Sequence, residues 1–282
     1  MTTTDAVAAA VHRLRAAGCV FAEEEAEVLR EASGHDDAAL AALVERRAAG
    51  EPLEQVVGYA DFCGVRVRLR PGVFVPRVRS ELLVQLAVEA GRGTENKARR
   101  GTEEEASRGT EQAEEEEVVV DLCCGSGALG LAVRHRRPGI TLHAADLDPV
   151  AVACARENLG SNVHQGDLFT ALPADLRGRI DVLLANVPYV ATSHIPFLPA
   201  EARDHEPRIA LDGGDDGLAV FRSVAAEARS WLTPHGTLIS EITEAQTGTA
   251  IEIALENGLT ATVATDDDLD ARAIIARPDR RR

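Results

Sequence analysis

Residues 118–130, VVVDLCCGSGALG, place a glycine turn directly after a short apolar run. Three valines lead into Asp121, the turn carries Gly125 and Gly127, and small apolar residues then recur at helical spacing. Glycine lets the backbone adopt positive φ and approach a ligand, and the following helix directs free N–H groups at that ligand. No Gly-Lys-Ser/Thr follows, which excludes a phosphate loop, and the glycine spacing is a weak dinucleotide signal. The turn leaves two ligands open, a dinucleotide and S-adenosylmethionine (SAM).

Apolar runs and helical patterns alternate from residue 118 to near the end of the sequence. The alternation predicts an α/β fold with a doubly wound, mainly parallel sheet and right-handed crossovers. The last two strands share a short polar connection and predict an antiparallel edge. Ligands of such sheets bind beyond the carboxyl ends of the strands. Strands are expected at 118–122, 141–145, 181–185, 236–241, 260–265 and 272–276, another ends before Asp167, and helices are expected at 128–136, 149–158, 217–232 and 245–257.

The first part of the chain is organised differently and predicts two smaller units. Residues 1–52 carry helical apolar stripes separated by glycines, which predicts a helical domain. Residues 53–78 contain alternating apolar residues and arginines, a turn expected at Pro71-Gly72 and a returning strand at 73–75, which predicts a β-hairpin linker. The remainder, 79–282, forms the third predicted domain.

A low-complexity stretch interrupts this third domain. The unit Arg-Gly-Thr-Glu occurs at 92–95, 100–103 and 108–111, and a run of glutamates follows. Nothing in this stretch can bury apolar area, so a disordered insertion is predicted at 91–117.

Charge and cysteine content narrow the class of partner and the compartment. The net charge of −16 argues against a wide nucleic-acid-binding surface, although Arg66, Arg68 and Arg70 leave open either a solvated strand face or a contact with an anionic partner. No apolar run reaches the length of a membrane span, so no membrane partner is expected. The five cysteines are odd in number and lack C-x-x-C spacing, so we expect no metal site, no disulfide and a cytoplasmic location.

Two acids follow predicted strands where a bound nucleoside would lie. Asp146 comes about twenty residues after the glycine turn, where a carboxylate can accept hydrogen bonds from two ribose hydroxyls. Asp167 follows the next strand and either accepts from an adenine amino group or is a plain turn residue. Asp148 precedes Pro149 and is expected to cap the helix that begins there.

Asn186-Val187-Pro188-Tyr189 directly follows the apolar strand at 181–185. An amide, a proline and an aromatic ring continue a sheet poorly, but they suit a clamp for a flat –NH2 group. The Asn186 side-chain oxygen and the Val187 carbonyl can each accept one hydrogen of that group, and Tyr189 offers its ring face. An amide nitrogen held in this way can attack an electrophilic methyl group without a strong base, because positioning and charge stabilisation carry such a reaction.

These motifs resemble those of the class I SAM-dependent protein-(glutamine-N5) methyltransferases, which modify peptide-chain release factors. The resemblance covers nearly the whole chain outside the insertion and rests on EPLEQVVGYADFCG, FVPRVRSE, DLCCGSGALGLA, AADLDPVAVACARENL, GDLF, NVPYV and EPRIALDGGDDGL. It implies a Rossmann-like domain with a seven-stranded, mainly parallel sheet and an antiparallel edge. It also implies an N-terminal helical domain that recognises the protein substrate, and SAM as the cofactor.

Position by position, the resemblance implies a cofactor site and a catalytic site. The favoured substrate is the glutamine of a release factor's Gly-Gly-Gln loop, and a ribosomal-protein glutamine is second. An exocyclic amine of nucleic acid, and a SAM-binding protein without catalysis, are the alternatives. The implied cofactor-binding residues are Asp121, Cys123, Gly125, Ser126, Gly127, Asp146, Asp167, Leu168 and Asn186, and the implied catalytic residues are Asn186, Val187, Pro188 and Tyr189.

The chain departs from the family pattern at three places. Val187 stands where a first proline is usual, which keeps the backbone carbonyl but makes the loop less rigid. Cys123-Cys124 replaces a Gly-Thr-like pair and is either a small buried pair or a redox sensor. Arg79 takes the place of an acid near the mouth of the site. These changes bear on the choice of substrate more than on the chemistry.

Overall fold

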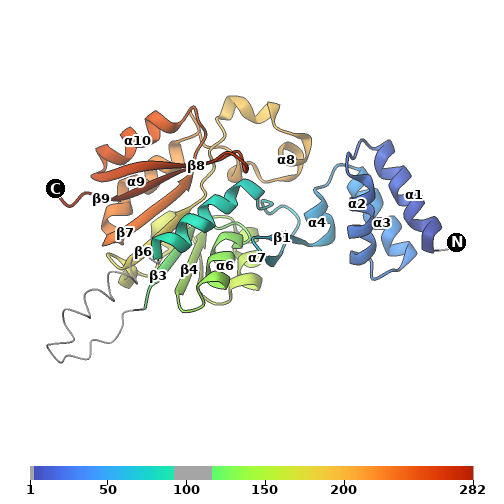
Figure 1. Cartoon of the computed structure of the whole chain (residues 1–282), viewed down its shortest axis with the longest axis horizontal. Helices are drawn as coiled ribbons and strands as arrows, with labels where there is room; N and C mark the ends of the chain where they lie inside the picture. The colour runs from blue at the N-terminus through green and yellow to red at the C-terminus, as the bar shows by residue number, and fades with distance from the viewer. Residues whose placement is uncertain (1–2, 92–115, 282) are drawn as a thin grey trace.

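The computed structural model describes residues 3–91 and 116–281. The insertion predicted at 91–117 lies almost entirely outside the described residues, so it stays a prediction. The described chain has a group of helices at one end, a small β-hairpin next to them, and an α/β sandwich that makes up the rest (Figure 1). None of the described helices is long and apolar enough to cross a membrane.

The α/β sandwich is built on one sheet, whose described strands lie in the order β5-β4-β3-β6-β7-β9-β8. In this sheet β9 pairs antiparallel with both β7 and β8, and the other described strand pairs are parallel. The predicted seven-stranded sheet with an antiparallel edge is confirmed. The strands are β3 (Val118–Leu122), β4 (Thr141–Asp146), β5 (Val163–Gln165), β6 (Ile180–Ala185), β7 (Leu232–Glu241), β8 (Leu259–Asp266) and β9 (Ala271–Pro278).

Helices cover both faces of the sheet because successive strand residues point to opposite sides. α9 (Ala219–Trp231) and α10 (Thr247–Glu256) cover one face, where Val118 and Val120 of β3 are buried. The other face buries Val119 and is covered by α6 (Ala128–Arg136), α7 (Pro149–Leu159) and a helix at residues 81–91. Each buried valine stabilises the fold by about 1.5–3 kcal/mol, so this run holds β3 at the centre of two cores.

Short 3-10 helices complete the sandwich where the chain turns between strands. They are η1 (Val78–Ser80), η2 (Leu168–Ala171), η3 (Ala174–Leu176), η4 (Thr192–Phe197) and η5 (Arg208–Ala210).

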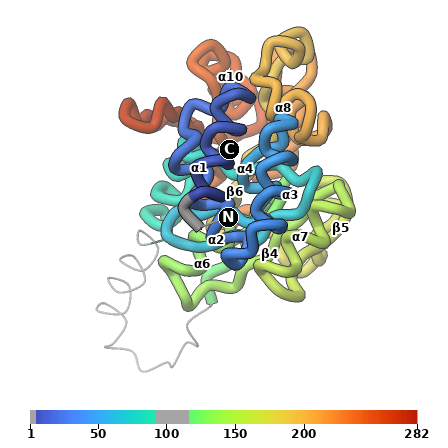
Figure 2. The backbone as a smooth tube through the Cα atoms, turned by 90° about the vertical axis from the view of Figure 1, so that its right-hand side faces the viewer, coloured from blue at the N-terminus to red at the C-terminus, as the bar shows by residue number. Residues whose placement is uncertain are grey.

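The N-terminal helices α1 (Thr3–Ala16), α2 (Ala22–Ala32) and α3 (Asp37–Ala48) pack around a separate hydrophobic core. A leucine from each helix is buried there, with at most 2% of its surface exposed. Seen from this end of the molecule, the three helices stand in front of the sandwich (Figure 2). Helices therefore fill the region where the sequence predicts them, while the division into three domains stays a prediction.

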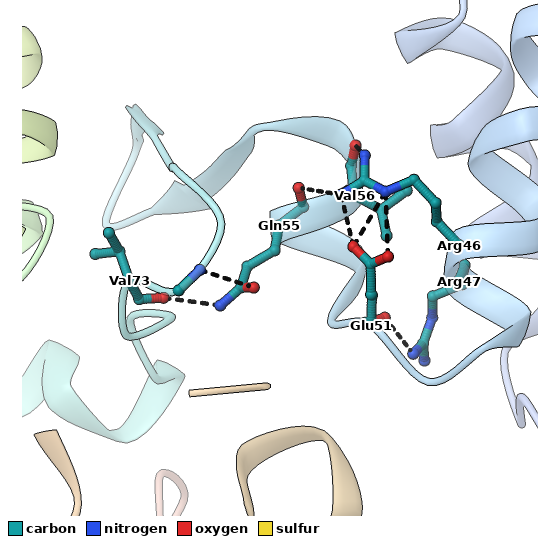
Figure 3. A network of polar contacts seen from close by, with 7 residues as sticks. Arg46, Arg47, Glu51, Gln55, Val56 and Val73 are labelled. Atoms are coloured by element: carbon teal, nitrogen blue, oxygen red, sulfur yellow. Dashed lines mark hydrogen bonds and ion pairs between the residues drawn. The ribbon is translucent and has the colours of Figure 1, made fainter. Parts of the chain in front are cut away.

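A polar network joins α3 to the segment that follows it (Figure 3). Arg46 pairs with Glu51 at 2.6 Å and donates to two backbone carbonyls of α4 (Leu53–Val57). Gln55 of α4 donates its side-chain amide to the carbonyl of Val73 at 2.9 Å. Because the Gln55 side chain is buried, this bond both satisfies the amide and fixes α4 against the chain that leads into the sandwich.

Arg47 joins the N-terminal helices to the sandwich by ion pairs. Its side chain is largely buried and pairs with Glu25 of α2 at 2.7 Å and with Glu201 at 2.6 Å. Glu201 lies in α8 (Ala200–His205), which belongs to the segment between β6 and β7. The pair with Glu25 is largely buried, whereas the Glu201 side chain is half exposed, so the contact with Glu201 links the two parts but contributes less than a fully buried pair would.

The β-hairpin lies earlier in the chain than the sequence pattern predicts, which corrects that prediction. β1 (Tyr59–Phe62) pairs with β2 (Val65–Arg68), and the turn between them is Cys63-Gly64 rather than Pro71-Gly72. Both turn residues have positive φ, 51° and 83°, as a two-residue hairpin turn with the right twist requires. Residues 73–75 form no strand, and their two valines are buried in a small cluster of their own.

Two of the three arginines at 66, 68 and 70 pair with carboxylates. Arg66 pairs with Asp61 across the hairpin at 2.9 Å, and Arg70 pairs with Glu157 of α7. Exposed ion pairs of this kind stabilise by less than about 1 kcal/mol. The pairing favours the solvated strand face over a surface that contacts an anionic partner.

Candidate active site

β3 and β6 lie side by side at the centre of the sheet, and the chain leaves them toward opposite edges. Leu122 pairs with Ala185, so the glycine turn and the segment 186–189 start next to each other. This is the switch point at which open parallel sheets bind their ligands. A cavity of about 660 Å³ opens there, lined by residues of both segments, and its size suits a small-molecule ligand.

Asp146, at the end of β4, holds the glycine turn in place. Its two carboxylate oxygens accept hydrogen bonds from the amide nitrogens of Gly125 and Asp148, at 2.8 and 2.9 Å. Burial raises the pKa of Asp146, and these two N–H groups oppose that rise. A carboxylate has about four lone-pair sites, so Asp146 retains acceptors for further donors. It lines the cavity, as the predicted ribose contact requires.

The turn has the backbone geometry that glycine permits. The φ angle is 55° at Gly125 and 77° at Gly127, and α6 begins directly afterwards. A Cβ at Gly127 would lie 2.7 Å from the Cδ1 of Leu159, so this glycine allows α6 and α7 to approach each other. Cys123 also has a positive φ, 54°, which costs a non-glycine residue about 1–3 kcal/mol. Strain of this kind beside a cavity is typical of functional turns.

Asp121 lies behind the turn and outside the cavity wall. It is fully buried, its Oδ2 accepts a hydrogen bond from the amide nitrogen of Gly130 at 3.0 Å, and its Oδ1 has no partner within the described residues. Burial raises the pKa of Asp121 to about 7, and the nearby charge of Asp146 adds to that rise. Asp121 therefore fastens α6 to β3, and any effect of this residue on a cofactor is exerted through the turn.

Most residues predicted for the site meet at the cavity. Asp167 and Leu168 reach it at the start of η2, where Gly166 donates to the Asp146 carbonyl at 3.0 Å and brings the end of β5 next to β4. Asp121 and Gly127 do not line the cavity. The predicted residues in its wall are Cys123, Gly125, Ser126, Asp146, Asp167, Leu168, Asn186, Val187, Pro188 and Tyr189.

Asn186 lies in the wall of this cavity. Its side-chain Nδ2 donates to the hydroxyl oxygen of Ser80 at 3.2 Å. Its Oδ1 is buried and has no hydrogen-bond partner within the described residues. A buried carbonyl oxygen left unpaired costs about 1–3 kcal/mol, which makes this atom a candidate acceptor for a hydrogen bond from a ligand. An –NH2 group is a donor that matches it.

Glu241, at the end of β7, is the centre of the network behind Asn186. Its Oε2 accepts the hydroxyl of Ser80 at 2.6 Å. Its Oε1 accepts the phenol of Tyr189 at 2.7 Å and the Nε of Arg79 at 2.9 Å. Burial and the charge of Glu241 raise the pKa of Tyr189 well above its usual value, so the phenol keeps its proton and donates it. Ser80 and Glu241 are not among the residues predicted from the sequence, although an acid at the end of a strand beside β6 was a signal.

The glycines of the segment 206–217 pack against the backbone of 187–190. Gly213 donates to the carbonyl of Val190 at 2.8 Å, and a Cβ at Gly213 would lie 2.6 Å from the Pro188 oxygen. Glu206 anchors the same segment, because its carboxylate pairs with Arg77 at 2.7 Å. The backbone of 187–190 is thus held by a second loop, which offsets the flexibility expected from Val187.

Of the two cysteines of the turn, Cys124 is buried, and Cys123 is partly exposed in the wall of the cavity. Burial raises the pKa of Cys123 and of Cys124 far above the usual range for a thiol. Their thiols therefore keep their protons, and the thiolate that redox chemistry needs is disfavoured. The raised pKa values of the two thiols disfavour the redox sensor, and of the predicted buried pair only Cys124 is buried.

Comparison with known proteins decides the family. The model of the methyltransferase small domain matches residues 109–199. The release factor glutamine methyltransferase of Streptomyces coelicolor is 36% identical, over 82% of this chain and 76% of its own. Those of Moorella thermoacetica and Cereibacter sphaeroides are 34% and 32% identical, and the matches cover 86% and 96% of this chain and the same shares of theirs. The chain belongs to the release factor glutamine methyltransferase family.

Solved structures also resemble this member of the release factor glutamine methyltransferase family. One is the ribosomal protein L11 methylase of Lactobacillus delbrueckii subsp. bulgaricus, at 17% identity and a TM-score of 0.47, over 76% of this chain and 85% of the other.

Two departures from the pattern of the release factor glutamine methyltransferase family lie within the site. Val187 is 2% exposed and packs into the core below α9, so the missing proline is replaced by a buried side chain. Arg79 lies over the Tyr189 ring, 5.7 Å from its centroid, while it pairs with Glu241. Arg79 therefore stands where the family pattern has an acid near the mouth of the cavity, and its positive charge is neutralised by Glu241.

Proposed function

We propose that this protein transfers a methyl group from SAM to the side-chain nitrogen of a glutamine in a protein, in the Gly-Gly-Gln loop of a peptide-chain release factor. With it we propose a cytoplasmic location, a catalytic domain at 79–282, a linker at 53–78, and substrate recognition by 1–52. The proposal rests on one observation above all. Asn186, whose side-chain Oδ1 is buried and has no hydrogen-bond partner within the described residues, lines the same cavity as Gly125 and Ser126 of the glycine turn.

The residues of the turn side fit SAM. The cavity volume of about 660 Å³ is in the range for ligands of this size. Asp146 retains lone pairs for ribose hydroxyls, while Gly125 and Ser126 let the ligand lie against the backbone. Asp167 and Leu168 flank the position proposed for the adenine ring.

The protein contributes to this reaction by positioning the glutamine amide. SAM, when bound, supplies a methyl group on a positively charged sulfur. The Oδ1 of Asn186 and the carbonyl of Val187 each hold one hydrogen of the glutamine –NH2 group, which turns the nitrogen lone pair toward that methyl group. The carbon–nitrogen bond forms as the carbon–sulfur bond breaks, and the nitrogen then loses one proton to solvent water. The products are an N-methylated glutamine and S-adenosylhomocysteine, and no strong base is needed.

The choice of substrate is supported by the relatives and by the charges on the surface. The curated relatives from three bacteria are named release factor glutamine methyltransferases. A nucleic-acid substrate is disfavoured because arginines of the hairpin region, Arg66, Arg70 and Arg77, are paired with carboxylates of the chain itself. A net charge of −16 acts in the same direction.

The test is methyl transfer from labelled SAM to a purified release factor, beside a ribosomal-protein fraction, bare RNA and bare DNA. We expect label on the release factor, and mass spectrometry that maps one added methyl group to the glutamine of its Gly-Gly-Gln loop. A factor with that glutamine replaced by alanine is the matched control and should stay unlabelled. Label on nucleic acid or on ribosomal protein alone would overturn the substrate, and SAM binding without transfer to any fraction would overturn the enzyme.

A further inference from the structure

We propose that Glu241, acting through Ser80, fixes the orientation of the Asn186 side-chain amide and so makes the site select a glutamine amide over a glutamate carboxylate. This inference rests on the proposed function and names a positioning device within it. It concerns residues that lie far apart in the sequence and meet only in the fold.

The first step is the direction of the hydrogen bond between Ser80 and Glu241. A carboxylate only accepts, so the single hydroxyl hydrogen of Ser80 is directed at the Oε2 of Glu241, at 2.6 Å. The other oxygen of Glu241 is occupied by the donors Tyr189 and Arg79. Ser80 is 2% exposed, so water does not compete for its hydroxyl.

The second step is the orientation of Asn186. Because the hydrogen of Ser80 is used by Glu241, its oxygen offers only lone pairs to Asn186. The amide of Asn186 must therefore turn its NH2 group toward Ser80, at 3.2 Å, and its oxygen away from Ser80. The unpaired state of that oxygen is the visible result.

The third step is selectivity. An oxygen in this position accepts from the –NH2 group of a glutamine, whereas a glutamate carboxylate offers no hydrogen and places negative charge against it. The reversed amide would present its NH2 group and favour the carboxylate. The hydroxyl of Ser80 and the charge of Glu241 thus decide which of two nearly isosteric side chains the site accepts.

Glu241→Gln tests the direction of the hydrogen bonds that run from Asn186 through Ser80 to Glu241. The oxygen of the new amide is expected to face Tyr189 and Arg79, which are both donors, and its NH2 group then faces Ser80. The hydroxyl of Ser80 is released to donate to Asn186, whose amide turns around. Ser80→Ala removes the constraint without reversing it, and Ser80→Thr restores the hydroxyl.

The measurement is the ratio of the dissociation constants of two release factors, one with Gly-Gly-Glu and one with Gly-Gly-Gln, titrated with S-adenosylhomocysteine present. For the unmodified protein we expect the Gly-Gly-Glu factor to have a dissociation constant at least about tenfold higher than the Gly-Gly-Gln factor. The ratio should be near one for Ser80→Ala and lower still for Glu241→Gln. Ser80→Thr should recover the ratio of the unmodified protein. Ser240→Ala removes another buried hydroxyl of β7, which bonds the Ala185 carbonyl, and should leave the ratio unchanged. A purely structural role for Ser80 predicts lower stability with the same ratio, which would overturn the inference.

A second readout does not depend on the substrate. In protein labelled with ¹⁵N asparagine, the side-chain NH2 signals of Asn186 are assigned by their loss in Asn186→Asp. One of the two hydrogens should exchange slowly with solvent, and that protection should be lost in Ser80→Ala and kept in Ser80→Thr. If neither release factor is bound or methylated, the proposed function fails, while this exchange still decides the orientation. Equal protection with and without the Ser80 hydroxyl would overturn the orientation even where methylation is observed.

Discussion

Gly213 lies against the carbonyl oxygen of Pro188, at a distance that leaves no room for a side chain. A Cβ there would lie 2.6 Å from that oxygen and equally close to the carbonyl oxygen of Gly217. The backbone that carries the proposed glutamine clamp is therefore positioned by a loop some twenty-five residues further along the chain. Backbone atoms cannot move aside as a flexible side chain can, so the contact is rigid.

We expect Gly213→Ala to displace the clamp. Overpacking against backbone should lower the free energy of unfolding by about 1–3 kcal/mol, and methyl transfer should fall further than SAM affinity does. Chemical denaturation, calorimetric titration of SAM and transfer of label measure the three effects. Gly248→Ala is the matched control, because a Cβ at Gly248 in α10 meets nothing within 4 Å. That control should keep full activity and gain up to about 1 kcal/mol of stability.

Asn186→Ala should abolish transfer while leaving SAM bound. The variant removes the oxygen that holds one hydrogen of the glutamine amide, which we expect to lower the turnover rate by at least about 100-fold. SAM affinity measured by titration should change little, since the turn side of the cavity is untouched. Asn257→Ala, directly after α10, removes a side-chain amide that donates to the Ile253 carbonyl of that helix, and serves as the control. Full activity in Asn186→Ala would remove this residue from its role.

Asp146→Ala should weaken SAM binding. The carboxylate is the proposed partner of the ribose and also bonds the Gly125 amide, so its loss should cost about 1–3 kcal/mol of binding free energy. Asp204→Ala, whose carboxylate pairs with Arg203 on the surface, should bind SAM normally. Isothermal titration distinguishes the two, and an unchanged SAM affinity in Asp146→Ala would contradict the ribose assignment.

The stability of the protein should fall as the pH rises through the titration of Asp121. Burial raises the pKa of Asp121 to about 7 in the folded protein, against about 3.9 in an unfolded chain. Between these two pH values the folded state binds a proton that the unfolded chain has released. The contribution of protonated Asp121 to the free energy of unfolding is therefore fully present below about pH 4 and is lost as the pH approaches 7. Asp121→Asn cannot ionise and should flatten this part of the profile. Denaturant unfolding at pH 5 and pH 8 measures the difference, and parallel profiles would contradict the assignment.

The sheet was predictable because its strands are local runs of apolar residues. Val118–Val120 and the strand at 181–185 are buried on both faces, and such runs are visible without knowing their neighbours. The predicted cap at Asp148 is confirmed, since its side chain accepts from the amide of Val150 at 2.8 Å. In each case the signal and the structure lie within a few residues of one another.

The parts that sequence reasoning missed depend on contacts between distant segments. Ser80 and Glu241 are 161 positions apart, and nothing in either local pattern shows that they share a proton. The hairpin was misplaced because alternation at 65–69 fits a partner on either side, and the positive φ of Cys63 is not a property that its residue type suggests. Tertiary packing decided both.

Because β9 is antiparallel to β7, the last described strand ends on the side of the sheet away from the candidate active site. Because β9 runs against β7, Pro278 lies toward the beginning of β7, at the edge of the sheet opposite the carboxyl ends of β3 and β6. The end of the chain is also drawn away from the N-terminal helices (Figure 1). A fluorophore or surface tether attached near Pro278 would therefore leave the approach of a large protein unobstructed, so single-molecule and immobilised measurements can be made there.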